Sequence, residues 1–185
     1  MTGLIILAII VAIVGYAIFV YNDLVSKRQL KEEGWSGIDV QLKRSNDLIP
    51  NLMETVKGYM SHERETLEAV TQARAAATAG ANASPAERSA LEGALSGALG
   101  KLIAIAESYP ELKANTTFLE FQEALQGVEE EIQMARRYYN GSVRNLNTTV
   151  ESFPSNVIAN AFKFEKAEYF ELDNEAERAV PQVKF

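Results

Sequence analysis

The sequence contains no cysteine and a single histidine, and both shortages restrict the chemistry that it can perform. Without cysteine the chain has no disulfide, no thiolate metal ligand and no thiol nucleophile, and its redox compartment stays undetermined. The one imidazole, His62, lies in the glutamate-rich stretch His-Glu-Arg-Glu, with no obvious residue to orient it as a general base. We therefore expect a solvated helix residue at position 62 and no nucleophile–base pair.

Three common kinds of binding site are also missing. A di-metal carboxylate centre in a helical bundle needs two Glu-x-x-His steps, and no glutamate lies three residues before His62. The glycines lie in predicted helices or connectors, so none forms a phosphate-binding loop after a strand. The net charge is −7, and no stripe dense in Lys and Arg with interleaved aromatics is present. The sequence thus predicts no catalytic centre, no cofactor, no metal site and no nucleic-acid partner.

What the chain does have is a long apolar run at its beginning. The segment from Gly3 to Tyr21 carries no charged or strongly polar side chain. As a helix rising about 1.5 Å per residue it spans roughly 28 Å, close to the hydrocarbon thickness of a bilayer. A cleaved signal peptide is the alternative, but no Lys or Arg precedes the run and no convincing small-x-small site follows it. We expect an uncleaved anchor that contacts membrane lipid.

The charges that flank this run predict its orientation. Lys27, Arg28 and Lys31 follow the apolar segment closely, whereas only the α-amino group precedes it. The positive-inside rule then places the N-terminus outside and the rest of the chain in the cytoplasm. A periplasmic or extracellular body remains the alternative.

Apolar residues recur at intervals of three, four and their sums between Trp35 and Val70, which predicts one amphipathic helix or two helices in phase. Pro50 interrupts this pattern, because proline lacks a backbone donor and its ring clashes with the carbonyl of Asn46. Either Asp47 caps a new helix or one helix kinks at the proline. The unbroken phase favours a kink or a very tight restart.

The small-residue stretch 75–85 is a predicted connector, with Gly80 and Asn82 available to stop a helix. Ser84, Pro85 and Glu87 then form a helix start signal, in which Ser caps and Glu reaches back.

The helix that follows ends before Pro110 and contains Gly93, Gly97 and Gly100. Each glycine costs about 1 kcal/mol of helix propensity relative to Ala, which indicates that another helix approaches closely. We expect a helix of the same chain in that place, with a seam between copies as the alternative.

The strongest pattern runs from Phe118 to Phe153 in steps of three or four residues and predicts one helix of about 50 Å. Thr117 and Glu120 resemble a capping box at its start, and Pro154 ends it. Together the segments predict an all-α fold: an N-terminal transmembrane helix followed by an antiparallel bundle of three to four long helices. A short helix around Val157 to Phe162 and an acidic, aromatic tail follow, and the tail either wraps the bundle or docks on a neighbour.

Several motifs resemble the LemA family of bacterial proteins. They read Tyr21-Asn22-x-Leu24-Val25, Trp35-Ser36-x-Ile38-Asp39-Val40-Gln41-Leu42-Lys43-Arg44 and Asp47-Leu48-Ile49-Pro50-Asn51-Leu52-x-Glu54-Thr55-Val56-Lys57-Gly58-Tyr59. The pairs His62-Glu63, Ala73-Arg74 and Phe153-Pro154, with Ala135-Arg136-Arg137-x-Tyr139-Asn140, extend the resemblance over roughly three quarters of the chain. Ser45 departs from the family pattern, where a further basic residue is usual, and so does Leu146, where an aromatic is usual.

The resemblance implies an N-terminally anchored membrane protein with a bundle of long helices, in a family without an established biochemical activity. It divides the chain into an anchor at residues 1–21, a LemA-like bundle at 22–162 and an acidic aromatic tail at 163–185. It also implies a bacterial cell membrane as the location.

The candidate structural or interaction residues lie on the first and last long helices. They are Trp35, Asp39, Lys43, Arg44, Asp47, Pro50, Asn51, Arg136, Arg137, Tyr139, Asn140 and Pro154. We expect the polar ones to form interhelical salt bridges and amide contacts to the carbonyl that Pro50 leaves without a donor. A ligand or partner site is the alternative.

These observations favour a membrane-tethered, non-enzymatic scaffold that self-associates or binds another membrane protein. The alternative function is an enzyme or a ligand sensor that uses a polar pocket near Pro50.

Overall fold

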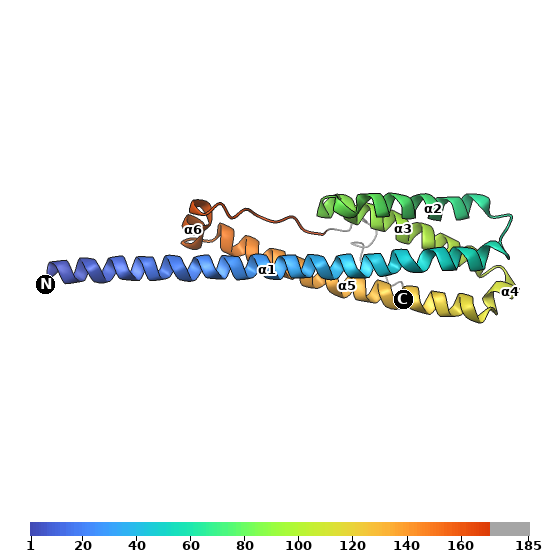
Figure 1. Cartoon of the computed structure of the whole chain (residues 1–185), viewed down its shortest axis with the longest axis horizontal. Helices are drawn as coiled ribbons and strands as arrows, with labels where there is room; N and C mark the ends of the chain where they lie inside the picture. Colours follow the sequence, from blue (N-terminus) through green and yellow to red (C-terminus); the bar gives the residue numbers. More distant parts are fainter. Residues whose placement is uncertain (171–185) are drawn as a thin grey trace, which may run out of the picture. The chain divides into compact units, whose positions relative to one another are not determined.

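The computed structural model describes residues 1–170, and these residues form helices and connections without a strand. The long helices are α1 (Thr2–Lys57), α2 (Arg64–Ala79), α3 (Pro85–Ala106) and α5 (Thr116–Glu151). Two short helices, α4 (Pro110–Lys113) and α6 (Ser155–Ala161), and a 3-10 turn at Gly80–Asn82 complete the order (Figure 1). The prediction of an all-α fold with an N-terminal apolar helix and a helical bundle is confirmed. The part of the predicted tail at 171–185 lies outside the described residues.

The chain folds as two units, which we describe separately. The anchor unit combines residues Met1–Ile38 with Met134–Tyr169, and the core unit combines residues Asp39–Gln133 with Phe170. Helices α1 and α5 each contribute one part to each unit.

The core unit has an apolar centre built from all of its helices. In it α2 and α3 pack against each other, and buried side chains of α1 and α5 join them. The buried residues are Ile49, Leu52, Met53, Val56, Met60, Val70, Ala77, Leu95, Leu99, Leu102, Ala106, Leu112, Phe118 and Leu125. Each helix turns one apolar stripe inward, as the spacing of three and four residues predicts.

The amphipathic pattern between Trp35 and Val70 belongs to two helices in phase. Helix α1 ends at Lys57, and α2 carries the last residues of the pattern from Arg64 onward. Pro50 lies inside α1 without a restart, so the alternative in which Asp47 caps a new helix is wrong. Asp47 is an exposed residue within the helix.

The predicted start signal of α3 is confirmed. The Glu87 backbone N–H donates to Ser84 Oγ at 3.3 Å, and the Ser84 backbone N–H donates to Glu87 Oε2 at 3.2 Å. This reciprocal pair satisfies two of the donors that a helix leaves unpaired at its N-terminus.

The predicted capping box of α5 at Thr117 and Glu120 is wrong. The helix begins at Thr116, and the backbone N–H of Phe118 donates to Asn115 Oδ1 at 3.0 Å. Asn115 therefore caps the helix, and Thr117 lies inside its first turn.

The close helix approach expected at the glycines of α3 is not found. A Cβ atom added at Gly93, Gly97 or Gly100 would meet no atom of the described residues within 4 Å. Close approaches occur instead at Gly34 of α1, where an added Cβ would lie 3.0 Å from the Cα atom of Tyr139, and at Gly80, where it would meet the Leu91 side chain of α3. The side of α3 that carries the three glycines is open.

Among the described helices, α1 and α3 are long and apolar enough to cross a membrane. Only 6% of the apolar window of α1 is buried inside the protein, and its large side chains from Leu4 to Phe19 are exposed. Helix α3 instead buries Leu95, Leu99 and Leu102 in the core unit, as the core helix of a water-soluble domain does. The N-terminal part of α1 is thus the segment with the surface of a lipid-embedded helix.

Candidate functional site

In the core unit, the carbonyl that Pro50 leaves without a helical donor has a partner on another helix. Arg74 Nε on α2 donates to the backbone oxygen of Asn46 at 3.1 Å. The prediction was an amide contact from the candidate residues, whereas the contact found is made by a guanidinium. Its donor is Arg74, which lay outside the twelve candidate residues, and it holds α2 against α1 at the proline.

Asp39, a candidate residue, forms an ion pair with Arg88 of α3. Arg88 Nη2 lies 2.5 Å from Asp39 Oδ1, and Nη1 donates to the backbone oxygen of Ala81 at 3.0 Å. The Arg88 side chain is 5% exposed and that of Asp39 is 56% exposed, so the guanidinium is buried and the carboxylate faces solvent. A buried guanidinium is tolerated only where hydrogen bonds and a counter-charge compensate for its lost hydration.

Sequence reasoning missed Arg88, although a signal was available. Arg88 precedes Leu91 and Leu95 by three and seven residues, the spacing that places it on the buried face of α3. A charged residue in such a position requires a partner, and Asp39 is that partner.

The other candidates near Pro50 do not converge. Lys43, Arg44, Asp47 and Asn51 are exposed residues of α1. Asp39 and the Asn46 carbonyl instead bind arginines of α3 and α2.

In the anchor unit, Trp35 and Tyr139 lie in contact. Their ring centroids are 5.4 Å apart at an interplanar angle of 54°, and the backbone of Tyr139 lies against Gly34. The Tyr139 hydroxyl donates to the backbone oxygen of Glu168 at 2.9 Å. Burial, with a smaller effect of the Glu168 charge, raises the pKa of Tyr139 to about 12. Tyr139 is thus a neutral hydrogen-bond donor at physiological pH rather than an acid or base.

Asn147 of α5 binds the extended segment at residues 164–169, which we call the strap. Its Nδ2 donates to the backbone oxygen of Ala167 at 2.9 Å, and the Ala167 N–H donates to its Oδ1 at 2.8 Å. A single buried amide therefore pairs with both backbone groups of one residue, much as a neighbouring β-strand would.

The beginning of the strap is held by aromatic contacts. The Phe164 ring lies 5.8 Å from the ring of Tyr21, and the Arg28 guanidinium carbon lies 5.5 Å from its centroid. The first part of the predicted tail therefore packs against its own chain, within the anchor unit.

The remaining candidates of α5 have different environments. Arg136 is buried, Asn140 is half-buried and Arg137 is exposed. Pro154 is exposed and ends the turn between α5 and α6, after a cis peptide bond with Phe153.

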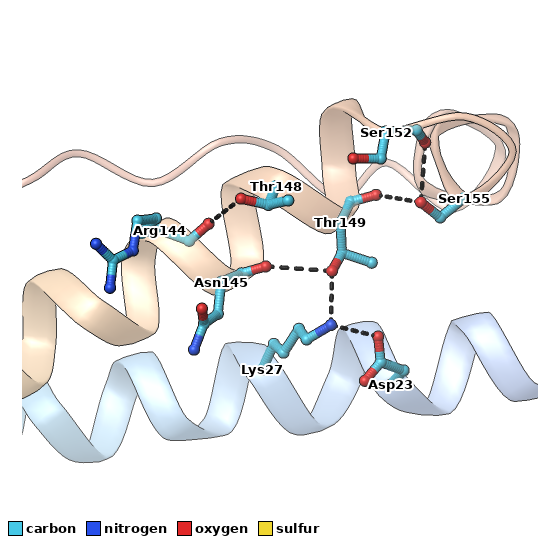
Figure 2. A network of polar contacts seen from close by, with 8 residues as sticks. All are labelled: Asp23, Lys27, Arg144, Asn145, Thr148, Thr149, Ser152 and Ser155. Carbon is cyan, nitrogen blue, oxygen red and sulfur yellow. Dashed lines mark hydrogen bonds and ion pairs between the residues drawn. The ribbon is translucent and has the colours of Figure 1, made fainter.

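A polar network joins α1, α5 and α6 where α1 leaves its apolar segment (Figure 2). Lys27 Nζ lies 2.6 Å from Asp23 Oδ2 and also donates to Thr149 Oγ1 at 2.6 Å. The Ser155 hydroxyl lies 2.7 Å from the backbone oxygen of Thr149, one of the last carbonyls of α5. These bonds fix the turn that leads into α6.

What this arrangement can do chemically is hold helices together. Within residues 1–170, no three His, Asp or Glu side chains gather into a group that can hold a metal ion. His62 is exposed, as expected, but it lies in the turn between α1 and α2 and not in a helix. Asp39, Arg74, Arg88, Tyr139 and Asn147 bind backbone groups or each other. These residues act as struts between helices.

Comparison with known proteins agrees with this description. The LemA family model matches residues 34–185. The chain belongs to the LemA family. Protein LemA from Metamycoplasma hominis is 29% identical over 152 residues, which cover 79% of this chain and 68% of that protein.

Two other relatives of this LemA-family chain carry a different name. Magnetosome protein MamQ 2 from Paramagnetospirillum magneticum is 23% identical over 187 residues, covering 88% of this chain and 68% of that protein. Magnetosome protein MamQ from Magnetospirillum gryphiswaldense is 30% identical over 79 residues, covering 43% of this chain and 29% of that protein. None of these names is that of an enzyme. The family and the apolar N-terminal helix indicate a membrane-associated protein.

Proposed function

We propose that the chain is a membrane-anchored, non-enzymatic scaffold that binds another copy of itself or another membrane protein. The observation that carries this proposal is the continuity of α1. Its first part presents apolar side chains outward, and its later residues Ile49, Leu52 and Val56 lie in the core of the folded body. One helix carries both the apolar N-terminal segment and these core residues, so a partner bound to the body is held at the membrane.

The open side of α3 supports self-association. Most of its exposed residues are small, namely Ala90, Gly93, Ala94, Gly97, Gly100 and Ala104, and Lys101 lies among them. Such a face lets another helix approach closely, and the propensity cost of three glycines finds no explanation among the described residues. A second α3 is the partner that this surface fits.

The size of the full chain in detergent tests the proposal. Wild-type protein is expected to elute as an oligomer in light-scattering chromatography, or together with a membrane protein captured by crosslinking in native membranes. Gly97→Leu adds a bulky side chain to the α3 face and is expected to shift the self-associated species to the protomer.

Gly127→Leu is the matched control, because Gly127 is also an exposed helical glycine of the core unit whose added Cβ meets nothing within 4 Å. It is expected to leave the assembly unchanged. A wild-type chain that runs as a lone protomer and captures no membrane protein contradicts the proposal.

The proposed orientation places the N-terminus outside and the body in the cytoplasm of a bacterium, on the strength of Lys27, Arg28 and Lys31. Protease added to spheroplasts is expected to spare the body and to digest it only after lysis. Digestion in intact spheroplasts would assign the body to the periplasm or the exterior.

A further inference from the structure

The turn between α5 and α6 exposes large apolar side chains outside the predicted membrane span. Phe153 is 83% exposed, Val157 is 58% exposed and Phe162 is 57% exposed. Phe153 lies in the turn and Val157 on α6, whose residues Ile158 and Ala159 pack against the rest of the anchor unit. We call Phe153, Val157 and Phe162 the apolar corner.

The apolar corner lies at the level where α1 leaves its apolar segment. The Phe162 ring is 4.8 Å from the ring of Tyr21, the last residue of the apolar run. Val20 and Leu24 are buried in one cluster with Ala159 and Leu146. Figure 1 shows α6 beside α1 within the anchor unit. The apolar corner therefore lies next to the exposed apolar surface of α1.

Hydrogen bonds hold the apolar corner in place within the anchor unit. Ser155 donates to the backbone oxygen of Thr149 near the end of α5, and Lys27 of α1 donates to the hydroxyl of the same threonine (Figure 2). The end of α6 closes with Lys163 at φ 57°, and the Phe164 N–H donates to the Ala159 carbonyl at 2.9 Å. This is the two-bond C-terminal motif that usually employs glycine.

We propose that the apolar corner is a second membrane contact, seated in the bilayer interface beside α1. Phenyl rings and a valine at the boundary of headgroups and acyl chains remove apolar surface from water, and short amphipathic segments bind there in the same way. The occupant is lipid, because the corner adjoins the lipid-facing surface of α1 through the Tyr21–Phe162 contact. Two contacts fix the rotation of α1 in the membrane, which one helix alone leaves free.

Three valines of similar exposure provide the test. Val157 in the corner, Val14 in the anchor and Val40 further along α1 are 58%, 52% and 60% exposed. Because the chain has no cysteine, each valine is changed to Cys in the full chain and labelled with an environment-sensitive fluorophore. The protein is placed in phosphatidylcholine–phosphatidylglycerol vesicles with spin-labelled lipids as quenchers.

The label at Val157 is expected to be quenched several-fold more by headgroup-proximal spin labels than the label at Val40. Val40 lies about 28 Å beyond Tyr21 along the continuous helix and is the negative control. The label at Phe153→Cys, the most exposed corner residue, is expected to follow that at Val157. Circular dichroism confirms that each variant is folded.

Quenching at Val157 equal to that at Val40 would overturn the proposal. So would shielding of Val157 from aqueous iodide without lipid quenching, because that result assigns the corner to a protein partner. The label at Val14 separates the two ideas: if it too escapes lipid quenching, the membrane anchor itself is wrong, and with it the proposed function.

Discussion

The core unit and the anchor unit are stabilised in different ways. The core unit buries a large set of apolar side chains from five helices, and burial is non-directional, so its energy is spread over many contacts. The anchor unit has a small apolar cluster around Val20, Leu24 and Leu146, and its strap depends on a few directional bonds from Tyr139 and Asn147. The strap is therefore expected to depend on a few individual residues, whereas the core is expected to lose stability in proportion to the volume removed.

The largest expected effect lies in the core unit. Leu52 is fully buried, and Leu52→Ala is expected to lower the free energy of unfolding by about 2–5 kcal/mol through lost burial and a cavity. Urea unfolding of the full chain in detergent, followed by circular dichroism, measures it. Val40→Ala, on the same helix but exposed, is the control and should change stability by less than about 0.5 kcal/mol. Equal effects of the two variants would contradict the assigned core.

Asn147→Ala tests the anchor unit's dependence on single residues. It leaves both backbone groups of Ala167 without their partner, and each unsatisfied group costs about 1–3 kcal/mol if it stays buried. We expect the strap to detach, with faster hydrogen exchange at the Ala167 amide and earlier cleavage by protease. Asn145→Ala, an exposed asparagine of the same helix, should leave the strap protected.

Arg74→Met tests whether the core unit also depends on a directional bond, because the substitution removes one. The Asn46 carbonyl loses its donor, and we expect a loss of about 1–2 kcal/mol in the free energy of unfolding. In a Pro50→Ala background the new backbone N–H can donate to that carbonyl, so the same substitution should cost less. A double-mutant cycle measures the difference. Additive costs would show that the Arg74 bond does not compensate for the proline.

The smallest expected effect is an increase in stability. Lys163 adopts a positive φ that favours glycine, so Lys163→Gly should raise the free energy of unfolding by about 0.5–1 kcal/mol. Lys163→Ala is the control, because alanine pays the same backbone cost and should give no gain. Thermal unfolding of the three proteins decides between these outcomes.

Much of the fold was predictable because helix formation depends on local sequence patterns. The apolar stripe that begins at Phe118 and the capping residues Ser84 and Glu87 were recognised from spacing alone, and both are present. The predicted end of the stripe was wrong, because α5 ends at Glu151 and Phe153 lies exposed in the following turn. The start of α5 was misplaced because Asn115 and Thr117 are both good caps, and only the geometry of the turn selects Asn115.

The candidate site was less predictable. Trp35, Asp39 and Tyr139 make contacts between elements in the structure, but Arg74 and Arg88 were missed as partners. The first lies 28 residues from Asn46 and the second 49 residues from Asp39. The open face of α3 was also predicted wrongly, because a run of glycines indicates a close approach without saying whether the neighbour belongs to the same chain.

By itself the sequence determined the apolar first segment, the positions of the long helices and the inward stripe of each. These properties follow from side-chain polarity and from hydrogen bonds between residues three or four positions apart. Only the tertiary structure decided that Arg74 donates to the Asn46 carbonyl, that Asn147 holds the strap and that the apolar corner meets Tyr21. Such pairings depend on how packed helices bring distant residues together, and no local pattern encodes that distance.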